Sequence, residues 1–108
     1  MTAYNIVRMR VKPGREKEFL DLHSKDDTGM TQRLLKNGFR KGAIVKTGDR
    51  TYCFIGEWDS FDSIIKSRDD MIKNLDAMRD MLEDLGGGLG LTDPISGEAV
   101  VELGAPAR

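Results

Sequence analysis

Two guanidinium groups and three aromatic rings, each spaced by two or four residues, lie in separate parts of the chain. Arg8 and Arg10 lie near its start, and Tyr52, Phe54 and Trp58 lie near its middle. In an extended strand, alternate side chains point to the same face. Guanidinium groups hold planar anions through paired hydrogen bonds and also stack on rings. If the two strands are neighbours, these side chains could bind a planar anionic ligand.

The same residues also have a purely structural interpretation. Arg8 and Arg10 could pair with Glu57 or Glu102 at a sheet edge or subunit contact, because buried charges are normally paired. Trp58 is the only tryptophan, and large aromatic side chains chiefly contribute buried area. Both interpretations stay open on the sequence.

One cysteine and one histidine limit other kinds of chemistry. Cys53 alone forms neither an internal disulfide nor a zinc site built from several cysteines. On a strand, it is more typical of a small buried residue than of a nucleophile. His23 has no second imidazole or thiolate to share a metal, and we expect it near a helix end, where a protonated imidazole is favoured. We therefore predict no metal site.

Charge is divided unevenly along the chain. Residues 1–54 hold twelve basic against six acidic side chains, residues 55–108 hold five against twelve, and the net charge is −1. We expect the two halves to neutralise each other, because a nucleic-acid-binding domain usually has a high pI and this chain has one near 5.8. With no long apolar run and no signal-peptide pattern at the start, we expect a cytoplasmic protein without nucleic-acid or membrane partners.

Hydrophobic spacing predicts helices and strands along the chain. The predicted elements are a strand Tyr4–Lys12, helices Arg15–His23 and Met30–Lys36, strands Phe39–Thr47 and Thr51–Trp58, a short helix capped by Asp59 or Ser60, a long helix, and a last strand Ala99–Leu103. The long helix is capped by Ser67 together with Asp70. It carries an apolar stripe from Met71 to Leu85. Gly86–Gly88 then reverses the chain through left-handed conformations.

The order of these elements predicts the fold. It is βαββαβ with one helical insertion, which places the helices on one face of a four-stranded antiparallel sheet in a ferredoxin-like α+β domain. The domain spans residues 1–108, with a flexible tail at 104–108. We expect Tyr52, Phe54 and Trp58 on the open sheet face, beside Arg8 and Arg10. An exposed aromatic patch marks an interaction surface, so we predict a homodimer whose two sheets enclose a barrel-like interior.

Short motifs in these elements resemble a known family. Ile6–Gly14 leads to Glu18-Phe19, and Glu57–Phe61 ends the third strand. With this element order, the chain resembles the antibiotic biosynthesis monooxygenases of the dimeric α+β barrel superfamily. Gly48-Asp49-Arg50 and Asp84–Pro94 are similar to signatures of an uncharacterised bacterial subgroup.

The resemblance implies cofactor-independent oxidation of a small aromatic or quinol-like compound inside the barrel. Members of this kind are similar in using Trp, Tyr, Asn and Arg side chains to hold and deprotonate the substrate. The matching residues, expected from the resemblance, are Trp58, Tyr52 and Arg8 as catalytic groups and Arg10, Phe54 and Asn5 as ligand-binding groups. No cofactor is expected: haem-degrading members also carry an Asn on the first strand, but they need a histidine ligand that this chain lacks in its second helical region. The alternative is a non-catalytic ligand-binding or structural dimer.

Overall fold

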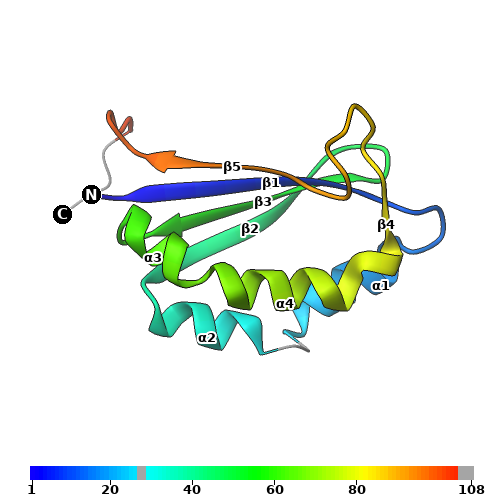
Figure 1. Ribbon diagram of the computed structural model, residues 1–108, viewed down its shortest axis with the longest axis horizontal. Coiled ribbons are helices and arrows are strands. Elements are labelled where there is room, and N and C mark those ends of the chain that lie inside the picture. The colour runs from blue at the N-terminus through cyan, green and yellow to red at the C-terminus, as the bar shows by residue number, and fades with distance from the viewer. Residues whose placement is uncertain (27–28, 105–108) are drawn as a thin grey trace.

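An antiparallel sheet forms one layer of the protein, and the helices lie together on one side of it (Figure 1). The computed structural model describes residues 1–26 and 29–104. The elements are β1 (Ala3–Val11), α1 (Glu16–Ser24), α2 (Met30–Lys36), β2 (Phe39–Gly48), β3 (Thr51–Trp58), α3 (Phe61–Lys66), α4 (Arg68–Met78), the 3-10 turn η1 (Arg79–Met81), β4 (Leu82–Glu83) and β5 (Asp93–Glu98). In the described residues no helix has both the length and the apolar character that a bilayer crossing requires.

Strand β1 lies in the middle of the sheet. The strand order is β2-β3-β1-β4, and β5 also pairs with β1. One edge of β1 pairs with β3 from Ala3 to Arg10. The other edge pairs first with β5, opposite Ala3–Arg8, and then with β4, opposite Arg10 and Val11. The ferredoxin-like α+β fold is therefore confirmed, with five strands in place of four.

Most predicted element boundaries are close to those of the structure. Helix α2 and strand β3 have the predicted bounds, and a tight turn at Asp49 and Arg50 joins β2 to β3. Ser60 caps α3, since its Oγ accepts a hydrogen bond from the Ser63 backbone N–H at 3.2 Å. Ser67 is the N-cap residue of α4, as predicted, but its side chain makes no capping hydrogen bond. Its backbone also ends α3 and is not extended, whereas a capping serine usually is.

The long predicted helix ends earlier than its apolar stripe. Helix α4 stops at Met78, and Leu82 lies in β4 opposite Val11. The Lys12 backbone N–H donates to the Met81 carbonyl at 2.8 Å, and both Met81 and Leu82 are buried against β1 and α1. Leu82 and Glu83 thus pair with β1 and do not form the further helical turn that the sequence predicts, because burial in the tertiary structure overrides local helix propensity.

The last strand is also displaced from its predicted position. It is β5, Asp93–Glu98, and the predicted strand Ala99–Leu103 follows it without regular structure. Glu98 lies opposite Ala3, the first residue of β1, and only one further backbone hydrogen bond follows, from the Ala99 N–H to the Thr2 carbonyl at 2.8 Å. Pro94 is accommodated because β5 is an edge strand, where a missing N–H is tolerated. Residues 105–108 of the predicted tail lie outside the described residues.

The aromatic side chains of β3 face the helices, which corrects the predicted open face. Phe54 lies directly opposite Val7, and Tyr52 lies opposite Met9. Directly paired residues share one side of a sheet, and β1 presents its apolar side to the helices. Trp58 and Tyr52 are consequently 0% and 2% exposed.

Two apolar clusters form the core between the sheet and the helices. The first holds Met9, Val11, Phe19, Tyr52, Met78, Met81 and Leu82. The second holds Ala3, Met30, Leu34, Phe39, Trp58 and Ile64. Phe54 packs against both clusters. The core is thus divided along the length of the sheet, and a cavity lies where the two parts meet.

Candidate ligand-binding site

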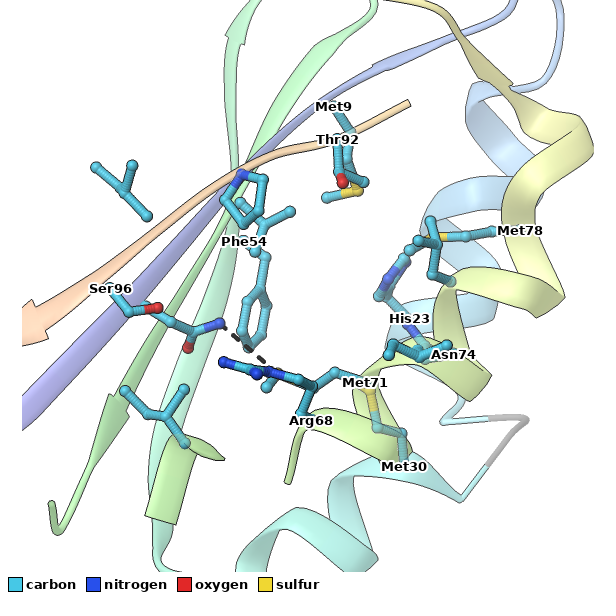
Figure 2. A pocket seen from close by; sticks show the side chains of 17 residues that line it. Met9, His23, Met30, Phe54, Arg68, Met71, Asn74, Met78, Thr92 and Ser96 are labelled. Carbon is cyan, nitrogen blue, oxygen red and sulfur yellow. Dashed lines mark hydrogen bonds between the residues drawn. The ribbon is translucent and has the colours of Figure 1, made fainter. Parts of the chain in front are cut away.

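A cavity of about 450 Å³ lies between the sheet and helix α4 (Figure 2). Its volume falls within the range of small-molecule pockets, roughly 300–1,000 Å³. The wall is mainly apolar, with four methionines and one aromatic ring among a few polar groups. The lining residues are Asn5, Val7, Met9, His23, Met30, Phe54, Ile64, Arg68, Met71, Ile72, Asn74, Leu75, Met78, Thr92, Pro94, Ile95 and Ser96. Unbranched methionine side chains adapt to ligands of irregular shape and contact aromatic rings favourably.

A buried polar pair holds one wall of the cavity in place. The Trp58 indole Nε1–H donates to Asn5 Oδ1 at 2.6 Å, and Asn5 itself is 3% exposed. The Asn5 amide nitrogen also approaches the Met71 sulfur at 3.7 Å. This bond fixes the orientation of the Asn5 amide, because Trp58 can only donate and the amide oxygen must therefore face it.

Gly56 leaves room for that pair. It lies opposite Asn5 in the β1–β3 ladder. A Cβ atom at this position would lie 2.6 Å from Asn5 Oδ1 and 2.9 Å from Trp58 Nε1. The absence of a side chain at Gly56 is thus required for the hydrogen bond above it.

His23 reaches the cavity from α1. Its ring packs against Phe19 with centroids 4.6 Å apart, and its Nδ1 lies 2.9 Å from the Phe19 carbonyl oxygen. Burial lowers the pKa of His23, and the hydrogen bond to Phe19 opposes that shift only in part. Since a carbonyl oxygen only accepts, the proton of the neutral ring is on Nδ1, and Nε2 keeps a free lone pair.

Arg68 brings a positive charge to the same cavity. It is the first residue of α4, and Figure 2 shows its side chain pointing into the cavity below Phe54. Among the described residues its guanidinium group has no ion pair, and the cavity lining contains no acidic side chain. The site therefore combines a mainly apolar wall with one cationic side chain, which is exposed to solvent.

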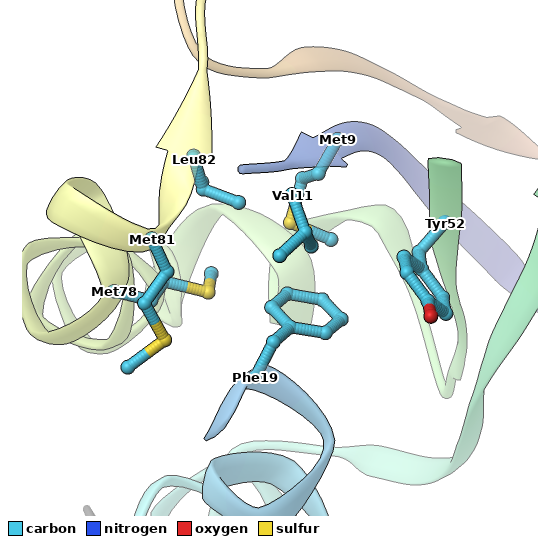
Figure 3. Packing of buried hydrophobic residues seen from close by; sticks show 7 residues of the cluster. All are labelled: Met9, Val11, Phe19, Tyr52, Met78, Met81 and Leu82. Carbon is cyan, nitrogen blue, oxygen red and sulfur yellow. The ribbon is translucent and has the colours of Figure 1, made fainter. Parts of the chain in front are cut away.

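Two of the predicted ligand-binding residues, Asn5 and Phe54, line this cavity. Trp58 lies behind the wall: it is fully buried and touches the site through Asn5. Tyr52 is at the far end of the first core cluster, beside Phe19 (Figure 3), and its hydroxyl donates to the Glu16 carboxylate. That bond raises the pKa of Tyr52, so its hydroxyl stays protonated near neutral pH.

Arg8 and Arg10 lie on the opposite face of the sheet, which corrects their predicted place beside the aromatic rings. Arg8 pairs across the ladder with Cys53, and Arg10 with Thr51. The Arg8 guanidinium group makes a 3.3 Å ion pair with Asp93. Both arginines extend from the helix-free face, because they alternate with the apolar side chains of β1 that face the helices. The structure therefore does not bring them together with Phe54 and Trp58.

His23, Arg68 and Asn74 are site residues that sequence reasoning missed. Each lies on a helix, and the sequence pattern shows only that α1 and α4 have an apolar side. Arg68 lies one turn before Met71 and Ile72 at the start of α4, but nothing in the sequence distinguishes it from an ordinary surface arginine. The described residues contain no group of three or more His, Cys, Asp or Glu side chains placed to hold a metal ion.

Together, the fold and the cavity define a class of α+β proteins with a partly open pocket between a ferredoxin-like sheet and its helices. The chain has the fold of antibiotic biosynthesis monooxygenase-like structures. One is a mutant form of SnoaB, a cofactor-independent oxygenase from Streptomyces nogalater, which is 14% identical with a TM-score of 0.71 over 96% of this chain and 98% of that one. Another is a candidate antibiotic biosynthesis monooxygenase from Bordetella bronchiseptica, 14% identical with a TM-score of 0.71 over 93% and 98%.

A third similar structure is a dimeric ferredoxin-like protein from an uncultured marine organism. It is 17% identical, with a TM-score of 0.66 over 94% of this chain and 95% of that one. No family model and no curated protein matches the sequence. The predicted resemblance is confirmed at the level of the fold.

Proposed function

We propose that the protein oxidises a small aromatic or quinol-like compound with dioxygen, without a cofactor, in the cavity between the sheet and α4. The observation that carries the proposal is the cavity itself, whose wall joins Phe54 and the Asn5 amide to four methionine side chains. Phe54 offers a ring for stacking. The Asn5 amide, oriented by Trp58, offers a polar group of fixed direction beside it.

The proposed reaction balances without a further reductant. A quinol and dioxygen give a hydroxylated quinone and water. One oxygen atom enters a ring C–H bond, and the two electrons released as the quinol becomes a quinone reduce the other oxygen atom. The pocket then has to bind the ring, favour its ionised form and exclude bulk water. The similarity in fold to a cofactor-independent oxygenase supports this reaction class.

We also propose that the protein is a cytoplasmic homodimer joined through the helix-free face of the sheet. Val45 lies opposite Cys53, and Ile95 lies opposite Ile6, so both side chains extend from that face. They are 39% and 62% exposed. Arg8 and Arg10 lie on the same face and would line the interior between two sheets. An exposed apolar face of this kind is typical of a subunit contact, and one structure of the same fold is a dimeric protein.

A cavity-filling substitution tests the oxidation. Leu75 lines the cavity, so Leu75→Phe should lower oxygen consumption with 1,4-naphthalenediol at least tenfold while the protein remains folded. The matched control is Leu89→Phe, at a half-exposed position that does not line the cavity, which should keep the wild-type rate. With ¹⁸O-labelled dioxygen, the quinone product should gain one labelled atom. A wild-type protein that consumes no oxygen with such quinols would refute the proposal.

A non-catalytic ligand-binding dimer is the second candidate. It is favoured by one observation: Trp58 and Tyr52, two of the predicted catalytic groups, are buried in the core and do not line the cavity. Binding of naphthalenediol that Leu75→Phe weakens, without any oxygen consumption in the wild type, would select this candidate.

A further inference from the structure

The cavity follows helix α4 from its first residue to its last. The lining from this helix begins at Arg68 and ends at Met78, and at 1.5 Å per residue these positions lie about 15 Å apart. Strand β1 forms the facing wall in the same direction. Asn5 lies 3.7 Å from the Met71 sulfur near the helix start, whereas Met9 shares a core cluster with Met78 at the helix end. The cavity is therefore an elongated slot between α4 and β1.

The two ends of the slot differ in exposure. Arg68, at one end, is exposed to solvent. Met9 and Met78, at the other end, are 1% and 5% exposed and belong to the first core cluster. Figure 2 shows Arg68 below Phe54, well away from Met9 and Met78. One end of the slot is thus reached by water, and the other is enclosed by the core.

Permanent charge is present only at the open end of the slot. Arg68 is the one lining side chain with a permanent charge, and none of the lining residues is acidic. Burial lowers the pKa of His23, so its ring is neutral near neutral pH. A guanidinium group binds a carboxylate through two parallel hydrogen bonds. At an open end the carboxylate also keeps part of its hydration, which limits the cost of burying its charge.

The wall beyond Arg68 suits a hydrocarbon chain. It is formed mostly by aliphatic and thioether side chains, which are Val7, Met9, Ile64, Met71, Ile72, Leu75 and Met78. Such side chains gain free energy from each CH2 group that they remove from water. Methionine adapts to an unbranched ligand because its own side chain is unbranched and flexible. The polar amide of Asn5 is already bonded to Trp58.

We propose that the slot binds an unbranched alkyl carboxylate, with its carboxylate paired to Arg68 at the open end and its hydrocarbon chain lying along α4 towards Met78. This binding goes beyond the proposed function, because it needs no aromatic ring and no reaction. The ligand would occupy the same cavity as a quinol and would therefore compete with it.

Titration calorimetry at pH 7.5 with octanoate, decanoate and dodecanoate tests the proposal. We expect one bound molecule per chain and an affinity that rises up to about fourfold for each added CH2 group. Decyltrimethylammonium, which has a chain of the same length and the opposite charge, should bind at least tenfold more weakly than decanoate. Equal binding of these two compounds, or an affinity independent of chain length, would overturn the proposal.

Arg68→Gln tests the partner of the carboxylate. It should weaken decanoate binding about tenfold, a typical effect of removing a hydrogen bond to a charged group. Arg79→Gln is the matched control: it changes the net charge equally, and Arg79 is exposed, pairs with Asp76 and does not line the cavity. The control should bind decanoate as the wild type does. Equal losses in the two variants would refute the role of Arg68.

Leu75→Phe tests the path of the chain. Leu75 lies two helical turns beyond Arg68, so the larger side chain should leave octanoate binding nearly unchanged and remove most of the gain from octanoate to dodecanoate. Leu35→Phe is the matched control, because Leu35 lines only the adjoining cavity between α2 and β2. It should keep the wild-type dependence on chain length. A gain lost in Leu35→Phe and kept in Leu75→Phe would place the chain in the adjoining cavity and overturn the proposal.

These measurements need no turnover, and Trp58 fluorescence shows whether each variant is folded. If quinols are oxidised but alkyl carboxylates do not bind in the slot, the inference fails and the proposed function stands. If decanoate binds as expected and no quinol is oxidised, the proposed function fails and the inference stands.

Discussion

Gly56 lies beneath the hydrogen bond between Trp58 and Asn5, and a methyl group there would collide with both partners. In Gly56→Ala the new Cβ would lie 2.6 Å from Asn5 Oδ1 and 2.9 Å from Trp58 Nε1. The neighbouring Phe54 ring, at 3.0 Å, closes the remaining side. Neither polar atom can move away without leaving a buried group unpaired.

The cost follows from these contacts. Overpacking a tight core typically costs about 1–3 kcal/mol, and a buried polar group left without its partner costs about 1–3 kcal/mol. Because relief of the clash breaks the bond, the two effects overlap in part. We expect Gly56→Ala to lower the free energy of unfolding by about 2–4 kcal/mol.

Urea denaturation followed by Trp58 fluorescence measures this effect, since the chain has one tryptophan and it reports on the bond itself. Gly97→Ala is the matched control: Gly97 lies in β5 of the same sheet, and a Cβ there would meet nothing within 4 Å. We expect the control to change stability by less than about 0.5 kcal/mol. Equal unfolding free energies for the two variants, with the same native emission spectrum, would show that the Asn5–Trp58 bond does not constrain this position.

Two further predictions concern the core and the histidine. Leu82→Ala should cost about 3 kcal/mol in a urea titration because Leu82 is 2% exposed, whereas Leu89→Ala, at a 46% exposed position, should cost less than about 1 kcal/mol; equal losses would contradict the burial of β4. The folded-state pKa of His23 is lowered from 6.5, so its contribution to stability is present above pH 6.5 and is lost as pH falls through the folded-state pKa. His23→Asn should therefore flatten the pH dependence of the unfolding free energy just below pH 6.5, and an unchanged slope would show that His23 is solvated.

Local patterns predicted the elements whose structure depends on neighbours in sequence. The alternation of side chains between two faces predicted β3, and apolar residues three and four positions apart predicted α2. Ser60, one of the two predicted caps, caps α3. The end of α4 could not be predicted in this way. Leu82 continues the helical stripe, but its position is decided by Val11, which is remote in sequence.

The candidate site was predicted only in part, for a similar reason. Alternation divides β1 and β3 each into two faces, but it does not show which faces coincide when the strands pair. The register that places Phe54 opposite Val7 moves the aromatic rings to the helix side and leaves Arg8 on the other. Asn5 and Phe54 reach the cavity, whereas the burial of His23 depends on elements that only the folded chain brings together.

The position of β1 in the sheet affects the order in which the protein can form during synthesis. β1 precedes the strands with which it pairs, and the strands that complete its second edge, β4 and β5, begin more than 70 residues after β1 ends. Until β4 and β5 emerge, the backbone N–H and C=O groups along the second edge of β1 are unpaired, and a strand of another chain can pair with them. A nascent chain that has not yet reached Asp93 therefore leaves most of this edge of β1 unpaired, and the sheet closes only after β5 has been translated.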